Sequence, residues 1–190
     1  MTSSTQDRIL REFLRLLAER GFDATTTRLL AEEAGVNEVT VFRLFGDKAN
    51  LASEAFRRFA PVEQFANYTV AIDTSSNERV VDGILDVLNV LRRGMLEHVA
   101  LVEFNMAEYW RLPQLKDQLA TIPRAARELV ERALDNAAPR LRPDLDRRRA
   151  SLSLIGLLLV SVIWQTRGWI ELSDAEWDAT ARQAVQGLLR

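Results

Sequence analysis

The chain has 190 residues, which is enough for one large or two small domains with proper cores. Its 47% hydrophobic and 27% charged residues are ordinary for a soluble globular protein, and its formal net charge is −2. The absence of cysteine excludes disulfides, thiolate metal sites and cysteine nucleophiles, and the single histidine, His98, excludes a multi-histidine metal site. We therefore expect no metal and no cofactor.

The N-terminal residues MTSSTQDRIL lack a basic segment followed by an apolar core. This predicts a cytoplasmic protein without a signal peptide. From Gln6 to Arg20, apolar residues recur at helical spacing with charged residues between them. The pattern predicts a helix that ends at Gly21 and covers the helices that follow it.

Residues 22–51 contain the most informative pattern of the chain. A short helix is predicted at Arg28–Ala34, with Thr26 or Thr27 as its N-cap because a threonine oxygen can accept hydrogen bonds from the open backbone N–H groups. Gly35 ends this helix, since glycine reaches the left-handed conformation without a Cβ clash.

A second short helix is predicted directly after this turn, at Glu38–Phe45, with Asn37 as its N-cap. Val41 and Phe45 lie four residues apart and share one inward face. Two helices joined by a glycine-containing turn form a helix-turn-helix, whose second helix fits the DNA major groove. A purely structural helical corner would give the same pattern in these residues alone.

The connection after the second helix predicts another tight corner. Asp47 is the expected N-cap of a helix at Lys48–Phe59, and Pro61 ends that helix. Lys48 then lies in the first helical turn, where its ammonium and the helix N-terminus can meet a DNA phosphate.

Over this N-terminal region the sequence resembles the tetracycline-repressor (TetR/AcrR) family of transcriptional regulators. The resemblance implies an N-terminal DNA-binding domain, in which Lys48 belongs to the motif, and a C-terminal domain for ligand binding and dimerisation. The matching residues are Gly21, Phe22, Thr25, Thr26, Thr27, Leu30, Ala31, Ala34, Gly35, Val36, Thr40, Val41, Phe42, Arg43, Phe45, Lys48 and Leu51.

The expected DNA contacts combine phosphate-binding groups at the start of the first motif helix with base-reading groups on the second. Arg43 is best matched to guanine O6 and N7, Glu38 to cytosine N4, and Val39 to a thymine methyl group. The candidates are Thr26, Thr27, Arg28, Asn37, Glu38, Val39, Thr40, Phe42, Arg43 and Lys48.

Four positions differ from the usual family pattern, namely Val39, Phe42, Leu44 and Ala49. Phe42 and Leu44 stand where ring donors are common, so two phosphate contacts are expected to be missing. Phe42 is retained as a packing or van der Waals contact. Acidic and basic residues balance in the first sixty or so positions, so we expect modest affinity for random DNA and specificity that comes from a dimer.

The C-terminal half predicts further amphipathic helices and no strands, so the predicted fold is all-α. Apolar residues at helical spacing place helices at 78–97, 99–110, 122–138 and 174–189. The helix at 144–168 differs from these, because Ala150–Trp164 is apolar on nearly every side. Fifteen such residues are too few to span a bilayer, which needs about 20, so this helix needs a partner for its second face.

The family resemblance implies that the last two helices form a four-helix interface in a homodimer. It also implies an effector cavity in the C-terminal domain, although methionine and aromatic residues at helical spacing are also common in ordinary cores. The interface candidates are Leu152, Ile155, Leu159, Val162, Ile163, Trp177, Ala181, Val185 and Leu188. The effector candidates are Met95, His98, Glu103, Phe104, Met106, Tyr109, Trp110 and Trp164.

The predicted domains are a helix-turn-helix domain at 1–47, a connecting helix at 48–60 and a ligand-binding and dimerisation domain at 61–190. The predicted function is a DNA-binding regulator, a repressor released from a palindromic operator by a small apolar effector, with double-stranded DNA and a second copy as partners and no membrane. A small all-α enzyme or an adaptor dimer is the alternative. The enzyme is disfavoured because no phosphate-binding glycine loop or Glu-x-x-His pair is present.

Overall fold

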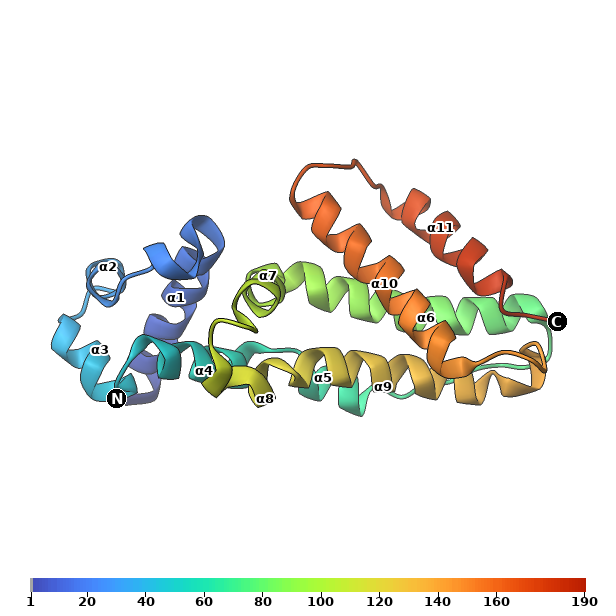
Figure 1. The fold of residues 1–190 in the computed structure, drawn as a ribbon, viewed down its shortest axis with the longest axis horizontal. Helices are drawn as coiled ribbons and strands as arrows, with labels where there is room; N and C mark the ends of the chain where they lie inside the picture. The colour runs from blue at the N-terminus through green and yellow to red at the C-terminus, as the bar shows by residue number, and fades with distance from the viewer. Residues whose placement is uncertain (1) are drawn as a thin grey trace. The chain divides into compact units, whose positions relative to one another are not determined.

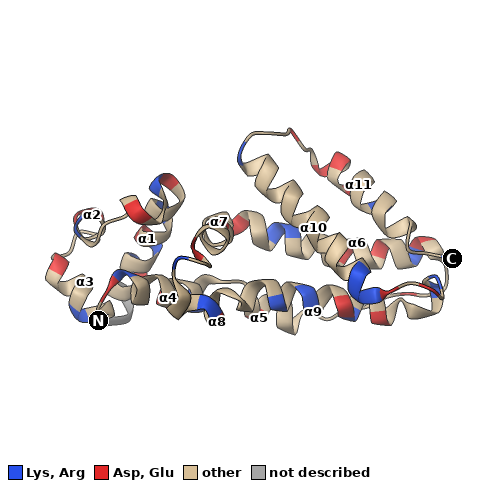
Figure 2. Ribbon diagram, viewed as in Figure 1, with Lys and Arg blue, Asp and Glu red and all other residues tan. Residues whose placement is uncertain are grey.

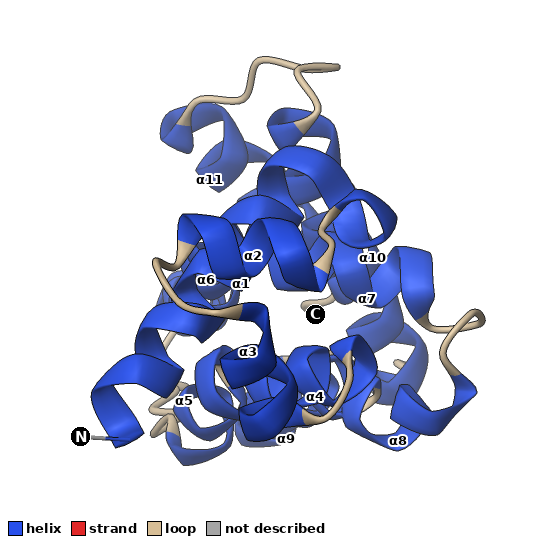
Figure 3. Ribbon diagram, turned by 90° about the vertical axis from the view of Figure 1, so that its left-hand side faces the viewer, coloured by secondary structure: helices blue, strands red, loops and turns tan. Residues whose placement is uncertain are grey.

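The computed structural model describes residues 2–190, and within them it confirms the predicted all-α fold (Figure 3). No strand forms in this range, and the only extended pairing is an isolated antiparallel bridge between Leu141 and Leu189. The helices fall into two compact units, of which the first extends to Ala60 and also includes His98–Thr121, and the second comprises Pro61–Glu97 and Ile122–Arg190.

The N-terminal unit is built around α1, which packs against α2, α4 and α7 (Figure 1). Gly21 interrupts α1 with φ 76°, as expected for a glycine that ends the regular helix. The elements of this unit are α1 (Thr2–Ala24), α2 (Thr27–Glu33), α3 (Glu38–Phe45), α4 (Lys48–Phe59), α7 (Val99–Glu108), the 3₁₀ turn η1 (Pro113–Leu115) and α8 (Lys116–Leu119).

The inclusion of α7 and α8 in this unit differs from the predicted domain limits. The physical reason is aromatic packing, because the buried ring of Phe104 on α7 lies 5.1 Å from Phe22 and 5.4 Å from Phe56, measured between ring centroids. These contacts join segments about fifty and eighty residues apart in sequence, which local periodicity does not reveal.

In the C-terminal unit, α6 packs against both α10 and α11. Figure 2 shows that α10 is uncharged along almost its whole length, with basic residues gathered at its start. The elements of this unit are α5 (Val62–Asn67), α6 (Asn77–Glu97), α9 (Thr121–Asn136), the 3₁₀ turn η2 (Ala138–Arg140), α10 (Arg147–Thr166) and α11 (Asp174–Gln186).

A glycine in α6 allows close packing of an aromatic ring. A Cβ added at Gly94 would lie 2.8 Å from two ring carbons of Phe65, which is itself fully buried. Gly94→Ala is therefore expected to lower the free energy of unfolding by about 1–3 kcal/mol through overpacking, despite a helix-propensity gain of about 1 kcal/mol. Urea denaturation measures this change.

The matched control is Gly187→Ala. Gly187 has φ −63°, and an added Cβ would meet only ordinary contacts at 3.4 and 3.8 Å. This control is expected to change the free energy of unfolding by less than about 0.5 kcal/mol. Equal effects of the two substitutions would contradict the packing role assigned to Gly94.

Candidate nucleic-acid interface

The turn between α2 and α3 is fixed by local hydrogen bonds. The Thr26 hydroxyl accepts from Leu29 N–H at 3.1 Å, and the Asn37 side chain accepts from Val39 N–H at 2.8 Å, so both predicted N-caps are confirmed. Gly35 has φ 62° and ends α2 in the left-handed region. Each cap uses an acceptor oxygen, so fewer acceptors remain for DNA, whereas the Thr26 hydroxyl and the Asn37 amide can still donate.

The helix α3 has one buried and one exposed face. Val41 is 2% exposed and Phe45 9%, which anchors the inner face as predicted. On the outer side, Val39 is 71% and Phe42 48% exposed, although both are large and apolar. Large apolar side chains held in solvent on a short, capped helix indicate a contact surface rather than part of the core.

A hydrogen bond links the two motif helices. The Thr27 hydroxyl of α2 donates to Glu38 Oε1 of α3 at 2.7 Å, and both residues are half-buried. The contact orients the Glu38 carboxylate at the first turn of α3. It also means that Thr27, a predicted phosphate contact, already uses its hydroxyl proton within the protein.

The three basic residues predicted to contact DNA differ in whether they already have a partner within the protein. Arg28 forms an exposed ion pair with Glu32, with 3.2 Å between Nε and Oε1. Arg43 is exposed and has no ion pair or hydrogen bond to another side chain among residues 2–190. Arg43 is therefore the cation on α3 that is available to DNA without rearrangement.

Lys48 lies in the first turn of α4, as predicted, but its ammonium faces the end of α1. Its Nζ donates to the Asp23 carbonyl at 3.3 Å and lies 4.1 Å from the centroid of the Phe22 ring. Burial lowers the pKa of the Lys48 ammonium, because a less hydrated site disfavours its charge. No sequence pattern indicates this arrangement beyond the presence of Phe22 in the motif.

The predicted effector candidates fall in both units. Met95 and Trp164 belong to the C-terminal unit, whereas the other six belong to the N-terminal unit. Phe104 is buried as an aromatic core residue, and His98, Glu103 and Tyr109 are half-buried. Met106, Trp110 and Trp164 are 53%, 80% and 45% exposed, so the expectation that they line an enclosed cavity is corrected.

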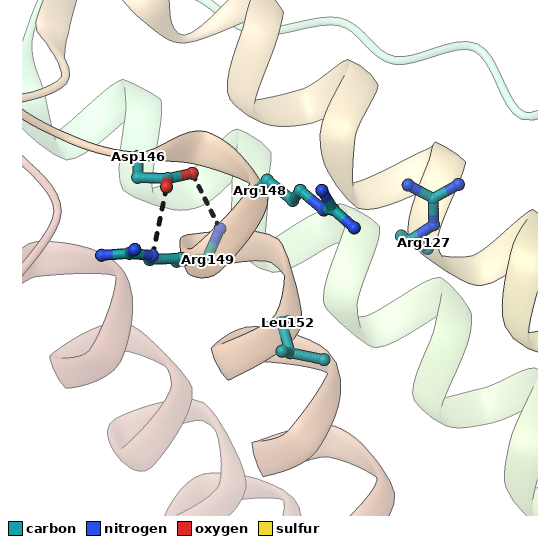
Figure 4. Close-up of a pocket in the computed structure, with 5 residues that line it drawn as sticks. All are labelled: Arg127, Asp146, Arg148, Arg149 and Leu152. Atoms are coloured by element: carbon teal, nitrogen blue, oxygen red, sulfur yellow. Dashed lines mark hydrogen bonds and ion pairs between the residues drawn. The ribbon is translucent and has the colours of Figure 1, made fainter.

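The C-terminal unit has more than one pocket on its surface. One, with a volume of about 600 Å³, is open to solvent and lies at the start of α10, where Arg149 pairs with Asp146 (Figure 4). The residues that line it are Arg127, Asp146, Arg148, Arg149 and Leu152. No group of three or more potential metal-ligating side chains occurs in the described part of the chain.

The predicted interface residues divide into a surface set and a core set. Leu152 is 70% exposed, and Ile155, Leu159, Ile163 and Leu188 are half-buried. The remaining four are corrected to core residues, because they are at most 1% exposed within a single chain, where α6 packs against α10 and α11. These four are Val162, Trp177, Ala181 and Val185.

Comparison with known proteins points to one family. Residues 9–55 match the family described as bacterial regulatory proteins, tetR family. The curated relative YvkB of Bacillus subtilis strain 168, an HTH-type transcriptional regulator, is 47% identical over 47 residues, a segment that covers 25% of each chain. The match therefore spans a quarter of that relative.

Solved structures match over the whole length. NalD, the secondary repressor of the MexAB-OprM multidrug efflux pump in Pseudomonas aeruginosa, has a TM-score of 0.71 at 23% identity, covering 100% of this chain and 98% of that one. HlyIIR, a hemolysin II transcriptional regulator, has a TM-score of 0.67 at 14% identity, covering 100% and 99%. At these identities the likeness concerns the fold. The family match itself concerns residues 9–55, which resemble the DNA-binding region of the tetR family of bacterial regulatory proteins.

Proposed function

We propose that the protein is a sequence-specific DNA-binding transcriptional regulator that inserts α3 into the major groove. The observation that carries this proposal is the outer face of α3, where Val39 and Phe42 are exposed and Arg43 lacks a partner among residues 2–190. Apolar side chains of this kind contact the edges of bases, and a guanidinium can donate two hydrogen bonds to one base. The helix-turn-helix holds it in a fixed orientation.

Each side chain of this face has a role set by its chemistry. Arg43 donates to guanine O6 and N7, Val39 contacts a thymine methyl group, and Glu38, oriented by Thr27, accepts from cytosine N4. Phe42 adds van der Waals contact. The phosphates are held by Thr26, Arg28, Thr40 and Lys48 and by the backbone N–H groups near Asn37.

We also propose that a homodimer binds a palindromic operator in the cytoplasm. The helix α10 has 20 residues and a mean hydropathy of 1.4, so by length and composition alone it would pass for a membrane span. Only 33% of its apolar stretch is buried within the chain, and Leu152, Val160 and Trp164 remain exposed. A second copy covers this face most simply, since two-fold pairing places two recognition helices on related half-sites.

Repression is the proposed direction of control, and NalD, described as a repressor, supports it by likeness of fold. Release by a small apolar effector stays a prediction from the family resemblance. It is tested by adding a panel of apolar compounds to the DNA-binding assay. A compound that weakens operator binding at constant salt would support the effector part of the proposal.

The first test is selection of duplexes from a pool with a randomised centre, followed by titration of the selected duplex. Arg43→Ala is expected to weaken binding to that duplex by roughly 1–3 kcal/mol, because a buried base edge loses its bidentate partner. Fluorescence anisotropy at near-physiological salt measures the dissociation constant.

Arg20→Ala, which removes an exposed arginine at the end of α1, serves as the control and is expected to leave the dissociation constant nearly unchanged. If the wild-type protein enriched no duplex over the starting pool, the proposed function would be wrong. If Arg43→Ala bound as tightly as the wild type, the assignment of the α3 face would be wrong.

A further inference from the structure

A cluster of charged residues surrounds the ammonium of Lys48 within the N-terminal unit. The ammonium is held by the Asp23 carbonyl at 3.3 Å and by the face of Phe22 at 4.1 Å. An ammonium has three donors, and the carbonyl uses one of them. The ammonium therefore still has N–H groups to offer to an anion, while its contacts with the carbonyl and the ring restrict the half-buried side chain.

The Phe22 ring that supports Lys48 is itself fixed by packing. Its centroid lies 5.1 Å from that of Phe104 at an interplanar angle of 67°, which is the favourable edge-to-face geometry. Phe104 in turn packs against Phe56 of α4, at 5.4 Å. The support for Lys48 is therefore a three-ring cluster that includes a residue of α7.

Two carboxylates lie beside this ammonium, and one arginine joins them. Arg111 Nη2 is 2.8 Å from Asp23 Oδ2, and Arg111 Nη1 is 2.9 Å from Glu108 Oε1. The Glu108 side chain is only 6% exposed, and its second oxygen is buried without a hydrogen-bond partner in the described part of the chain. Burial lowers the pKa of the Lys48 ammonium, and the nearby charges of Asp23 and Glu108 partly offset this effect.

We propose that Arg111 is a positioning residue for DNA binding, although it lies on the segment after α7 and outside the helix-turn-helix. By neutralising Asp23 and Glu108, it leaves the Lys48 ammonium free to donate to a DNA phosphate from its place on the Phe22 ring. The partial order of Lys48 reduces the side-chain entropy lost when the phosphate binds. This inference rests on the proposed function, since it assigns a residue to the same DNA-binding site.

The test measures DNA binding of Arg111→Ala on the duplex selected by the wild-type protein. Removal of the guanidinium leaves two unpaired carboxylates that attract the Lys48 ammonium and compete with the phosphate for it. The dissociation constant is expected to rise about fivefold at low salt, and the slope of log affinity against log salt is expected to fall by about one.

A double-mutant cycle separates this role from a structural one. Lys48→Ala is expected to weaken binding by a similar factor, and Arg111→Ala is expected to add almost nothing in the Lys48→Ala background. Glu108→Gln in the Arg111→Ala background is expected to recover most of the lost affinity, because it removes the buried unpaired charge without changing the shape of the side chain.

Arg57→Ala is the matched control, since Arg57 is an exposed, ion-paired arginine of the same unit that pairs with Glu54. It is expected to leave both affinity and salt slope unchanged. The inference would be overturned if Arg111→Ala left affinity and salt slope unchanged, or if it weakened binding equally with and without Lys48. Failure of the wild-type protein to select any duplex would instead overturn the proposed function itself.

Discussion

Leu152→Glu combined with Leu159→Glu is expected to convert the proposed homodimer into a monomer. The two residues lie two helical turns apart on α10, and Leu152 is 70% exposed in the single chain. In a two-fold interface each substitution is present twice, so four carboxylates would lose water on association. Sedimentation velocity at micromolar protein concentration measures the change in molecular mass.

The same variant is expected to bind the operator about a hundredfold more weakly or worse. In a monomer the second recognition helix is no longer held close to its half-site by the first. Trp110→Glu is the control, since Trp110 is 80% exposed but lies in the N-terminal unit. It is expected to remain dimeric. A wild-type protein that sediments as a monomer, or a double variant that stays dimeric, would show that α10 does not form the interface.

Trp177→Ala is expected to have the largest effect on stability, a loss of about 3–5 kcal/mol. Trp177 is 1% exposed, and its Nε1 donates to Asn89 Oδ1 at 2.6 Å, which joins α11 to α6. Its ring also lies 5.4 Å from the guanidinium carbon of Arg92, which is buried and donates to Asp174. Truncation leaves a cavity and removes one partner from the half-buried Asn89 amide and one from the buried Arg92 guanidinium. Urea denaturation followed by circular dichroism measures the loss.

One further variant separates the loss of ring volume from the loss of the N–H donor, and another serves as an exposed control. Trp177→Phe retains most of the ring volume and removes the N–H donor, so a smaller loss of about 1–2 kcal/mol is expected. Trp169→Ala removes a ring that is 69% exposed and is expected to cost less than about 0.5 kcal/mol. Similar losses for Trp169→Ala and Trp177→Ala would contradict the core position assigned to Trp177.

The local features of the N-terminal unit follow closely from sequence. The predicted bounds of Glu38–Phe45 and Lys48–Phe59 agree with α3 and α4, and Thr26, Asn37 and Asp47 cap their helices as expected. Caps and short amphipathic helices depend on residues within one or two turns, so their signals are contained in neighbouring positions.

Features that depend on distant residues could not be predicted in the same way. The place of Lys48 on Phe22 depends on Phe104 and Arg111, which lie more than fifty residues away. On α10, apolar residues surround the helix almost completely, so periodicity cannot tell the inner Val162 from the outer Leu152. Only the packing of α6 and α11 against α10 distinguishes these two sides.

The hydrogen bond from Thr27 to Glu38 has a consequence for redesign of the operator preference. The orientation of the Glu38 carboxylate depends on a hydroxyl that belongs to the preceding helix, and so does the base that we propose Glu38 selects. Substitutions at the two positions are expected to act non-additively, because either one changes what the other can bind. A library that varies α3 alone would leave Thr27 to favour acceptors at position 38, so new specificities are best sought by varying both helices together.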